Sequence, residues 1–457
     1  MKLPTGWAEA RFEDVVTVAR GVTFSKEQRS HVPSVGYVPC LRSGNVQRQL
    51  TVDNLIFVPA EVVKSPDRYI SEGDAIISMS NSYELVGKVA RADERHVGMT
   101  YGAFLSAFRS CKLDHDFLFN LLRSPSMQAA LRATASQTVN ISNLSISGMA
   151  DIAVPLPPIA EQRRIVVKLD ALTARLARAR AELDRVPVLA DHLRRGILSR
   201  AYSGNMTADW RGERGRGDAE WPVRALSDIA EVQGGIQVGK KRPKSAVLID
   251  TPYLRVANVQ RGWLKLEEIR KLGATVEERA RLVLRDGDIL MNEGGDRDKL
   301  GRGWVWRNEV ADCIHQNHVF RIRLNDDQFP PEFVSHYANE FGQPYFIDQG
   351  TQTTNLASIS KRRVMALPVP VPDADEATEI VRRIETAFAR ADRMEAEAAR
   401  ARALIDRLES AILGRAFRGE LVPQDPNDEP ASVQLDRIRA ERAAAPKPKR
   451  GRRAKTG

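Results

Sequence analysis

The feature that most constrains the fold is an internal duplication of the chain. Residues 1–204 and 221–419 carry matching residues in the same order, and the offset between matched positions drifts only between 213 and 215. Trp7 matches Trp221, and Gly73-Asp74 matches Gly287-Asp288. Ordered matches over this length do not arise by chance, so the chain consists of two copies of one module.

Each copy begins with a mixed globular domain of about 155 residues. Ala75–Met79 and Ile289–Met291 are apolar runs that follow Gly-Asp turns, which predicts buried strands. His318–Leu324 alternates between apolar and polar residues as a half-buried strand does, and Phe117–Ala133 predicts a helix. The sequence therefore favours an α+β domain in each copy.

A proline-rich joint ends each domain and leads into a segment with helical periodicity. Pro155–Pro158 and Pro368–Pro372 each stop a strand and stiffen the segment that follows. Apolar residues then recur at alternating steps of four and three, which is a heptad seam. We expect two long helices that pack on each other rather than on their own domains alone, and Pro187 is a position where the first helix can kink or break. The seam positions are Ile165, Leu169, Leu172, Leu176, Ala179, Leu183, Val186, Ala190, Leu193 and Ile197 in the first copy and Ile380, Ile384, Ala387, Ala391, Met394, Ala398, Ala401, Ile405, Leu408 and Ile412 in the second.

The net charge of +10 is concentrated at one end of the chain. Residues 437–457 carry a net +8, which leaves +2 for the rest. We expect a basic, disordered tail, centred on 447–455, that adds non-specific phosphate contact. Because the remaining body is nearly neutral, any nucleic-acid-binding surface on it has to be a local patch.

The cysteines and the apolar runs indicate a reduced, cytoplasmic protein. Cys40, Cys111 and Cys313 are far apart and form no CxxC pair, which argues against a zinc site or a disulfide framework. No run of apolar residues is long enough to span a membrane, and residues 1–13 lack the apolar core of a signal peptide.

No motif points to catalysis. Gly234–Lys241 is close to a phosphate-binding loop, but Lys241 stands where the Ser or Thr that holds magnesium is required, and a shared turn explains it better. Glu267, Glu268 and Lys271 indicate a solvated helix face rather than a nuclease cluster. His315 and His318 fit a surface strand better than a metal site, so we expect a binding protein without catalytic residues, metal or cofactor.

Polar loops occupy matching places in the two copies and are candidate DNA-reading elements. The loops directly after the Gly-Asp strands differ between the copies, and Asn, Gln and Arg side chains can read base edges in the major groove. Turn formation is the alternative for each single residue, and we expect a structural cap at Asn140 and Asn355. The candidates are Arg42, Asn45, Gln47, Ser80, Asn81, Ser82, Tyr83 and Lys88 in the first copy and Arg255, Asn258, Gln260, Asn292, Glu293, Asp296 and Arg297 in the second.

The order of these segments resembles the specificity subunits of type I restriction–modification systems. The resemblance rests on Pro155-Leu-Pro-Pro-Ile-Ala-Glu161-Gln162 before the first helix, Ala201-Tyr-Ser-Gly204 after it, and Ala416-Phe-Arg-Gly-Glu-Leu-Val-Pro-Gln-Asp-Pro426 after the second. It covers essentially the whole chain. One departure is Glu376-Ala377, where the first copy has Glu-Gln.

The resemblance implies two target recognition domains, separated by two long antiparallel helices that act as a spacer around a pseudo-twofold axis. Each domain is then expected to read one half of an asymmetric, bipartite duplex DNA site. Two modification (methyltransferase) subunits are expected to dock on the chain, and restriction subunits add ATP-dependent translocation and cleavage. A helical seam of 33 residues spans about 50 Å, or roughly 14 base pairs.

The expected boundaries follow from the duplication and the joints. A different class of function, a coiled-coil adaptor with two protein-binding domains, also fits two globular domains on paired helices. The expected segments are a first recognition domain at 1–156, a first spacer helix at 157–204, a linker at 205–220, a second recognition domain at 221–372, a second spacer helix at 373–419 and a C-terminal segment with the basic tail at 420–457.

Overall fold

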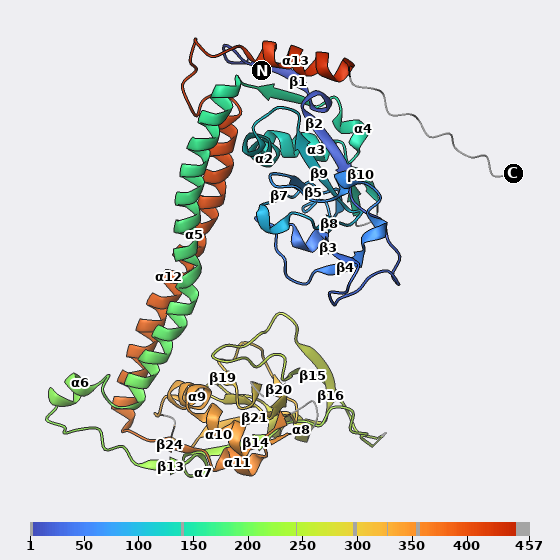
Figure 1. The fold of residues 1–457 in the computed structure, drawn as a ribbon. Coiled ribbons are helices and arrows are strands. Elements are labelled where there is room, and N and C mark those ends of the chain that lie inside the picture. Colours follow the sequence, from blue (N-terminus) through green and yellow to red (C-terminus); the bar gives the residue numbers. More distant parts are fainter. Residues whose placement is uncertain are drawn as a thin grey trace. The chain divides into compact units, whose positions relative to one another are not determined.

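The chain forms two compact units, and the first of them combines two separate stretches of the sequence (Figure 1). The computed structural model describes residues 3–138, 141–243, 245–295, 299–326, 328–352 and 357–444. The first unit combines 1–183 with 400–457, and the second consists of 184–399. The long helices α5 (Ile159–Tyr202) and α12 (Ala374–Ala416) each contribute residues to both units.

The first unit is built on small sheets packed with short helices. Its four-stranded sheet has the order β2-β9-β5-β7, and the strand β5 is buried on both faces, as the apolar run predicted. The strands are β1 (Ala8–Arg11) paired with β12 (Ala153–Leu156); β2 (Val16–Arg20), β9 (Leu105–Ser110), β5 (Ala75–Ser78) and β7 (Val89–Arg91); β4 (Ile56–Pro59), β3 (Tyr37–Leu41) and β8 (Thr100–Tyr101); and β10 (Ser136–Thr138), β11 (Ile141–Asn143) and β6 (Ser80–Asn81).

The second unit repeats this topology strand for strand. The sheet β14-β21-β17-β19 has the same order and directions as its counterpart in the first unit, and the predicted strands at 289–291 and 318–324 are β17 and β21. The duplication therefore extends to the sheet topology. The strands are β13 (Val223–Ala225) and β24 (Pro368–Pro370); β14 (Ala230–Gly234), β21 (Val319–Leu324), β17 (Ile289–Asn292) and β19 (Gly303–Val305); β16 (Arg270–Ala274), β15 (Ile249–Leu254) and β20 (Ile314–His315); and β22 (Thr351–Gln352), β23 (Ala357–Ser358) and β18 (Gly294–Gly295).

Short helices cover the sheets of both units. The helix expected over Phe117–Ala133 is two helices, because Pro125 begins a new helix and the Ser124 hydroxyl caps it by accepting from the Met127 amide at 3.3 Å. The short helices are α1 (Phe12–Val15), α2 (His115–Arg123), α3 (Pro125–Ala133) and α4 (Ile146–Met149) in the first unit and α6 (Ala208–Gly212), α7 (Leu226–Ile229), α8 (Val276–Leu282), α9 (Pro331–Glu340), α10 (Gly342–Gln349) and α11 (Lys361–Met365) in the second.

Matched glycines are required by close backbone contacts. A Cβ atom on Gly21 would lie 2.2 Å from the Gly102 carbonyl oxygen, and one on Gly235 would lie 2.0 Å from the His315 carbonyl oxygen. Both distances are far below van der Waals contact. Only glycine therefore allows the chain after β2 and β14 to pass this close to its neighbour.

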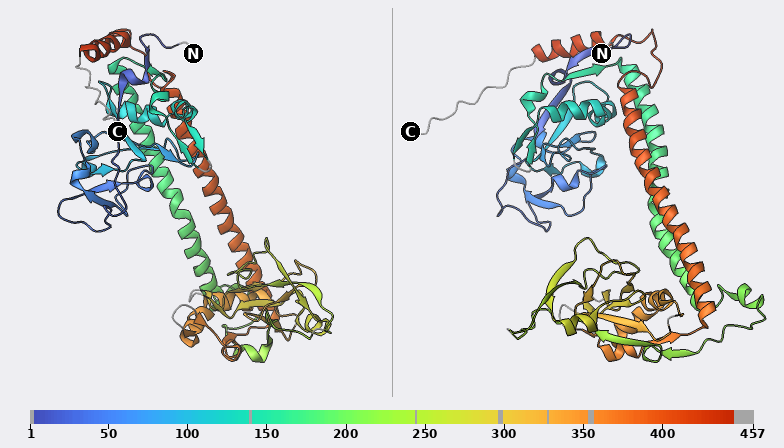
Figure 2. Two further views of the ribbon diagram at one scale, coloured as in Figure 1. Left: turned by 90° about the vertical axis from the view of Figure 1, so that its right-hand side faces the viewer. Right: turned by 180° about the vertical axis from the view of Figure 1, so that it is seen from behind.

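The helices α5 and α12 run antiparallel within each unit (Figures 1 and 2). In the first unit Ile165 and Leu413 share one core cluster while Arg180 bonds Asp406 further along. In the second unit Leu198 and Ile380 share a core cluster in the same way. The helix α5 is continuous through Pro187, so this proline does not interrupt it.

Four residues of the predicted seam do not face the helix interface. Ala179, Leu193, Met394 and Leu408 are exposed, while the other seam residues are buried or half-buried. The next residue in the chain faces the partner helix instead, and at all four places it is charged. Opposite charges at these positions pair across the helices, which leaves the apolar neighbour on the solvent side.

The end of each long helix completes the core of the domain that belongs to the other copy. Phe417, after α12, packs edge-to-face on Phe117 of the first domain at 5.3 Å between ring centroids. Tyr202, at the end of α5, packs on Phe333 of the second domain at 4.8 Å. A further helix, α13 (Ala431–Ala444), buries Leu435 in the first domain.

No helix among the described residues has the length and apolar composition that a membrane crossing requires.

Candidate nucleic-acid interface

The candidate reading loops of both domains are attached to one shared framework. In the first domain the Arg109 guanidinium donates to both carboxylate oxygens of Asp74, at 2.8 and 2.7 Å. In the second domain Arg323 and Asp288 make the same fork at 2.7 Å for both bonds. Bidentate pairs of this kind fix orientation as well as position. The sequence matches of Asp74 with Asp288 and Arg109 with Arg323 were available to reveal this pair, but sequence reasoning missed it.

Three predicted base-contacting asparagines have a different role. Asn45 is buried and its amide donates to the Thr51 and Asp53 carbonyl oxygens, at 3.1 and 2.8 Å. Asn258 makes the matching contacts in the second domain. Asn292 is fully buried and donates to the Val259 carbonyl oxygen at 2.9 Å. These amides hold the loops together. The prediction that the three asparagines contact bases is therefore corrected, and their role is to hold the loops.

Other candidates of the first domain remain accessible. The Lys88 ammonium donates to the Gln47 side chain at 2.5 Å, and Arg42, which is exposed, donates to the Asn54 carbonyl oxygen at 2.8 Å. Ser80, Asn81 and Ser82 are half-buried, and Tyr83 is exposed. These residues leave donor and acceptor groups at the surface of the loops.

A cavity of about 900 Å³ lies beside these residues in the first domain. Its lining includes the predicted candidates Arg42 and Gln47 together with two aromatic residues, Phe24 and Phe104. Phe104 is 66% exposed. A cavity lined by aromatic rings and a guanidinium can contact both the faces and the edges of nucleobases.

The second domain places different chemistry at the position that matches Phe104. His318 is 59% exposed at its side chain and its Nδ1 lies 2.7 Å from a carboxylate oxygen of Glu293, a predicted candidate. His318 is exposed directly before the strand β21, and the sequence did not reveal its pairing with Glu293. His315 lies in the strand β20 but is buried rather than at the surface: burial lowers its pKa to about 4, and its Nδ1 lies 2.7 Å from the Val319 carbonyl oxygen.

The other candidates of the second domain are half-buried or outside the described residues. Arg255 pairs with Glu268 at 3.1 Å, and Gln260 donates to the Ala257 carbonyl oxygen at 2.8 Å. Glu268 lies next to the strand β16, so the helix expected around it is absent. The candidates Asp296 and Arg297, the expected caps Asn140 and Asn355, and the tail 447–455 lie outside the described residues.

A buried carboxylate marks the start of each long helix. Glu161, at the start of α5, accepts from the Trp7 indole at 3.0 Å and from Gln424 at 3.2 Å. Burial raises the pKa of Glu161. Gln424 comes from the segment after α12, so the end of the second copy covers the start of the first copy's helix.

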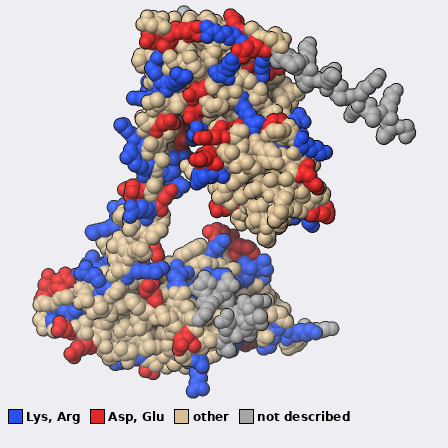
Figure 3. Space-filling view, in the orientation of Figure 1, with Lys and Arg blue, Asp and Glu red and all other residues tan. Residues whose placement is uncertain are grey.

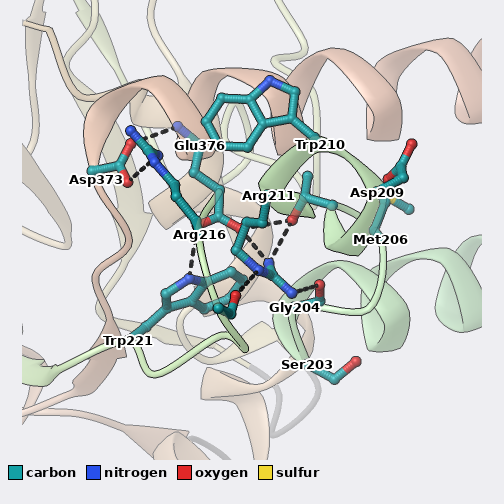
Figure 4. Close-up of polar contacts among 12 residues, drawn as sticks. Ser203, Gly204, Met206, Asp209, Trp210, Arg211, Arg216, Trp221, Asp373 and Glu376 are labelled. Atoms are coloured by element: carbon teal, nitrogen blue, oxygen red, sulfur yellow. Dashed lines mark hydrogen bonds and ion pairs between the residues drawn. The ribbon is translucent and has the colours of Figure 1, made fainter. Parts of the chain in front are cut away.

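The second unit builds the same junction with a charged partner (Figure 4). Glu376 accepts from the Trp221 indole at 3.1 Å, from the Thr207 hydroxyl at 2.7 Å and from the Arg211 guanidinium. Arg216 lies over the Trp210 ring, 5.0 Å from its centroid. The linker between the copies thus holds the start of α12 through a buried ion pair.

The departure from the Glu-Gln pattern has a local explanation. The Gln162 amide donates to the Pro157 carbonyl oxygen at 2.9 Å and its oxygen accepts from the Asp114 amide at 3.2 Å. At the matching position Ala377 is buried without such contacts. The two helix starts are therefore not equivalent in their polar contacts.

The visible face of each unit carries basic and acidic side chains that are interspersed (Figure 3). This agrees with the nearly neutral body expected from the sequence. Among the described residues no group of three or more His, Cys, Asp or Glu side chains could hold a metal ion.

Comparison with known proteins identifies the family. Residues 4–185 match the family model of the type I restriction modification DNA specificity domain. The specificity subunit of the type I restriction enzyme EcoKI from Escherichia coli strain K12 is 30% identical over 458 residues, which covers 97% of both chains. This chain belongs to the type I restriction enzyme specificity subunits. The StySPI specificity subunit of Salmonella potsdam is also 30% identical and covers 97% of both chains.

Solved structures of specificity subunits share the fold. The HsdS subunit from Thermoanaerobacter tengcongensis matches with a TM-score of 0.54 and 20% identity over 92% of this chain and 98% of its own. A chain from a structure on complex assembly and conformational transition of the type I R-M system matches with a TM-score of 0.66 and 20% identity, over 92% of this chain and all of its own. The mixed recognition domains and the two central helices are thus those of a specificity subunit.

Proposed function

We propose that this specificity subunit reads a bipartite, asymmetric site on duplex DNA, with one half-site for each recognition domain. It acts without catalytic residues of its own, in the cytoplasm. Two modification subunits dock on it and methylate the site, and restriction subunits join them for cleavage. The paired helices α5 and α12 set the spacing between the half-sites.

The observation that carries this proposal is the contrast between framework and surface. The Asp–Arg fork, the strand order and the loop-holding contacts of Asn45 and Asn258 are alike in both domains. At one matched surface position, however, the first domain exposes Phe104 and the second exposes His318 beside Glu293. A constant framework with different exposed groups suits two different half-sites.

Phosphate contact and base contact have different sources in this proposal. The body carries little net charge, so arginines and lysines at the loops provide local phosphate contacts and the basic tail adds a sequence-independent contribution. The exposed side chains of the loops provide the sequence preference. Affinity for every sequence should therefore fall steeply with added salt, while the preference for one site persists.

The experiment maps methylated sites when the chain is produced with its modification subunits. Phe104→His and His318→Phe are each expected to change the sequence read in one half-site and to leave the other half-site unchanged. Val35→Thr, at an exposed residue of the first domain, serves as the control and is expected to leave both halves unchanged.

Two results would overturn the proposal, and a third would correct the residues assigned to the interface. A change in both half-sites from either substitution would contradict one domain for one half-site. Unchanged half-sites in both variants would remove these positions from the interface. Absence of any preferred duplex would leave the coiled-coil adaptor as the better function.

A separate variant tests the spacer. Removal of one heptad from α5 between Leu169 and Leu193, together with the facing heptad of α12, should shorten the distance between half-sites and leave the half-sites themselves unchanged. An unchanged distance between the half-sites would show that the length of the helices does not determine that distance.

A further inference from the structure

The charges that face the helix interface are opposite at matched positions of the two copies. In α5 the residues are Arg180 and Arg194, and 215 positions later in α12 they are Glu395 and Glu409. The apolar seam around them differs in side-chain size, since Leu176 and Leu183 of α5 match Ala391 and Ala398 of α12. The charged positions add a difference in the sign of the charge.

In the first unit the pair is largely buried. Arg180 donates to Glu409 at 3.2 Å and to Asp406 at 2.6 Å. The side chains of Arg180 and Glu409 are only 13% and 12% exposed. Glu409 also accepts from Arg48 at 3.0 Å and from Arg123, so the first domain is tied to the same carboxylate.

In the second unit the matching pair again joins an arginine of α5 to carboxylates of α12. Arg194 donates to Asp392 at 2.5 Å and to Glu395. The side chains of Arg194 and Glu395 are about one quarter and one third exposed. The arginine comes from α5 and the carboxylate from α12 in both units. At these positions α5 is therefore basic and α12 is acidic.

We propose that these two arginine–carboxylate pairs make α5 selective for α12 as its partner and exclude the pairing of either helix with the same helix of a second copy of this chain. If α5 packed on a second α5 in the same antiparallel register, Arg180 would face Arg194 twice. If α12 packed on a second α12, Glu395 would face Glu409 twice. Like charges that face each other in a partly buried interface destabilise that helix pair.

The flanking acids strengthen this discrimination. Asp406 has the counterpart Asp191 in α5, but Asp191 is exposed and pairs with Arg195 on its own helix at 3.1 Å. Asp392 has the counterpart Ala177, which carries no charge. Two α5 helices would therefore bring four arginines together with few acids to compensate them.

The apolar seam contributes a difference in side-chain size. Leu172 and Leu176 of α5 match Ala387 and Ala391 of α12, but all four are aliphatic, so a wrong helix pairing would cost packing at these positions and would bring like charges together only at the charged positions. The consequence for recognition rests on the proposed function. Pairing α5 with α12 places two different domains on one pair of helices, rather than two identical domains. Selective pairing thereby keeps the recognised site asymmetric.

The test uses full-length protein without DNA, so it is independent of the proposed reading function. The variants are Arg194→Glu, Glu395→Arg and the double exchange, since the hydrogen bonds of this pair among the described residues join the two long helices and no recognition domain. Arg175→Glu with Arg178→Glu, both at exposed positions of α5, is the control for altered charge. Each single variant is expected to lower the melting temperature by about 5 °C, and the double exchange is expected to recover most of the loss, with Asp392 limiting full recovery.

The second measurement addresses partner choice. The two single variants, carrying different tags, are unfolded and refolded together, because each supplies the helix that complements the other. A several-fold higher yield of mixed dimers than from two tagged wild-type chains is expected. An additive loss in the double exchange would overturn the proposal. Recovery of stability without any increase in mixed dimers would also overturn it, since the pairs would then stabilise the helices without selecting the partner.

Discussion

The two buried carboxylates at the helix starts offer a matched test of how charge is held inside this protein. Glu376→Gln removes the charge that faces Arg211 in the second unit, where the two side chains are 4% and 8% exposed. Breaking a buried pair by neutralising one partner costs about 3–5 kcal/mol, because the remaining charge is left without compensation. Glu161→Gln makes the same chemical change beside neutral donors from Trp7 and Gln424.

The expected magnitudes therefore differ between the copies. Glu161→Gln removes charge from two hydrogen bonds and should cost about 1–2 kcal/mol, and the raised pKa of Glu161 shows that burial already disfavours its charged form. For units of this size, a loss of about 4 kcal/mol corresponds to a fall of roughly 10 °C in melting temperature. Glu376→Gln should thus destabilise the second unit several times more than Glu161→Gln destabilises the first.

Differential scanning calorimetry of the two variants and of Arg211→Met with Glu376→Gln measures this. The double variant should recover part of the loss, since it removes the uncompensated guanidinium as well. Equal losses for Glu376→Gln and Glu161→Gln would refute the reasoning, because the local partners would then not determine the cost. A double variant less stable than Glu376→Gln alone would refute it too.

Two further predictions concern the second unit. Burial lowers the pKa of His315 and of His336 to about 4, below the ordinary 6.5. Between these two pH values the unfolded chain binds more protons than the folded chain. The free energy of unfolding therefore has its full value above about pH 6.5 and falls by roughly 3 kcal/mol per histidine toward pH 4. Urea unfolding at several pH values should show this slope, and His336→Leu should reduce it; an unchanged slope would contradict the assignment. Gly235→Ala should lower the melting temperature by more than about 5 °C, because its Cβ would meet the His315 carbonyl, whereas Gly234→Ala, with open space at the Cβ, should have a small effect.

The duplication and the heptad period were sufficient to predict the architecture. Repeated Gly-Asp turns located β5 and β17, and the seven-residue repeat located both long helices. The heptad pattern placed Leu193 at the helix interface, but the neighbouring residue Arg194 faces the partner helix. Periodicity does not distinguish these adjacent positions, and the long side chain of Arg194 brings its charge to the partner helix. The helix α13 was missed because its few apolar residues acquire a partner only from the distant first domain.

The candidate site was harder to predict than the fold. Asn45 and Asn258 have the chemistry of base-reading residues, but the same amide groups also hold tight loops, and only burial separates the two roles. His318, directly before β21, and Glu293, directly after β17, are 25 residues apart in sequence. No local pattern records such a pair, whereas a comparison of the two copies position by position marks it as a place where they differ.

The pattern of divergence between the copies has a physical basis. A residue whose partner lies in its own copy, such as Asp74 with Arg109, meets the same environment in both copies and is retained as Asp288 with Arg323. A residue whose partner lies in the other copy meets a different surface, so the two versions are free to become complementary. Arg180 faces a carboxylate from the other copy, and its own counterpart is Glu395. A duplicated chain of two identical halves could pair its helices in several ways, and complementary divergence at the contacts between the copies reduces these to one.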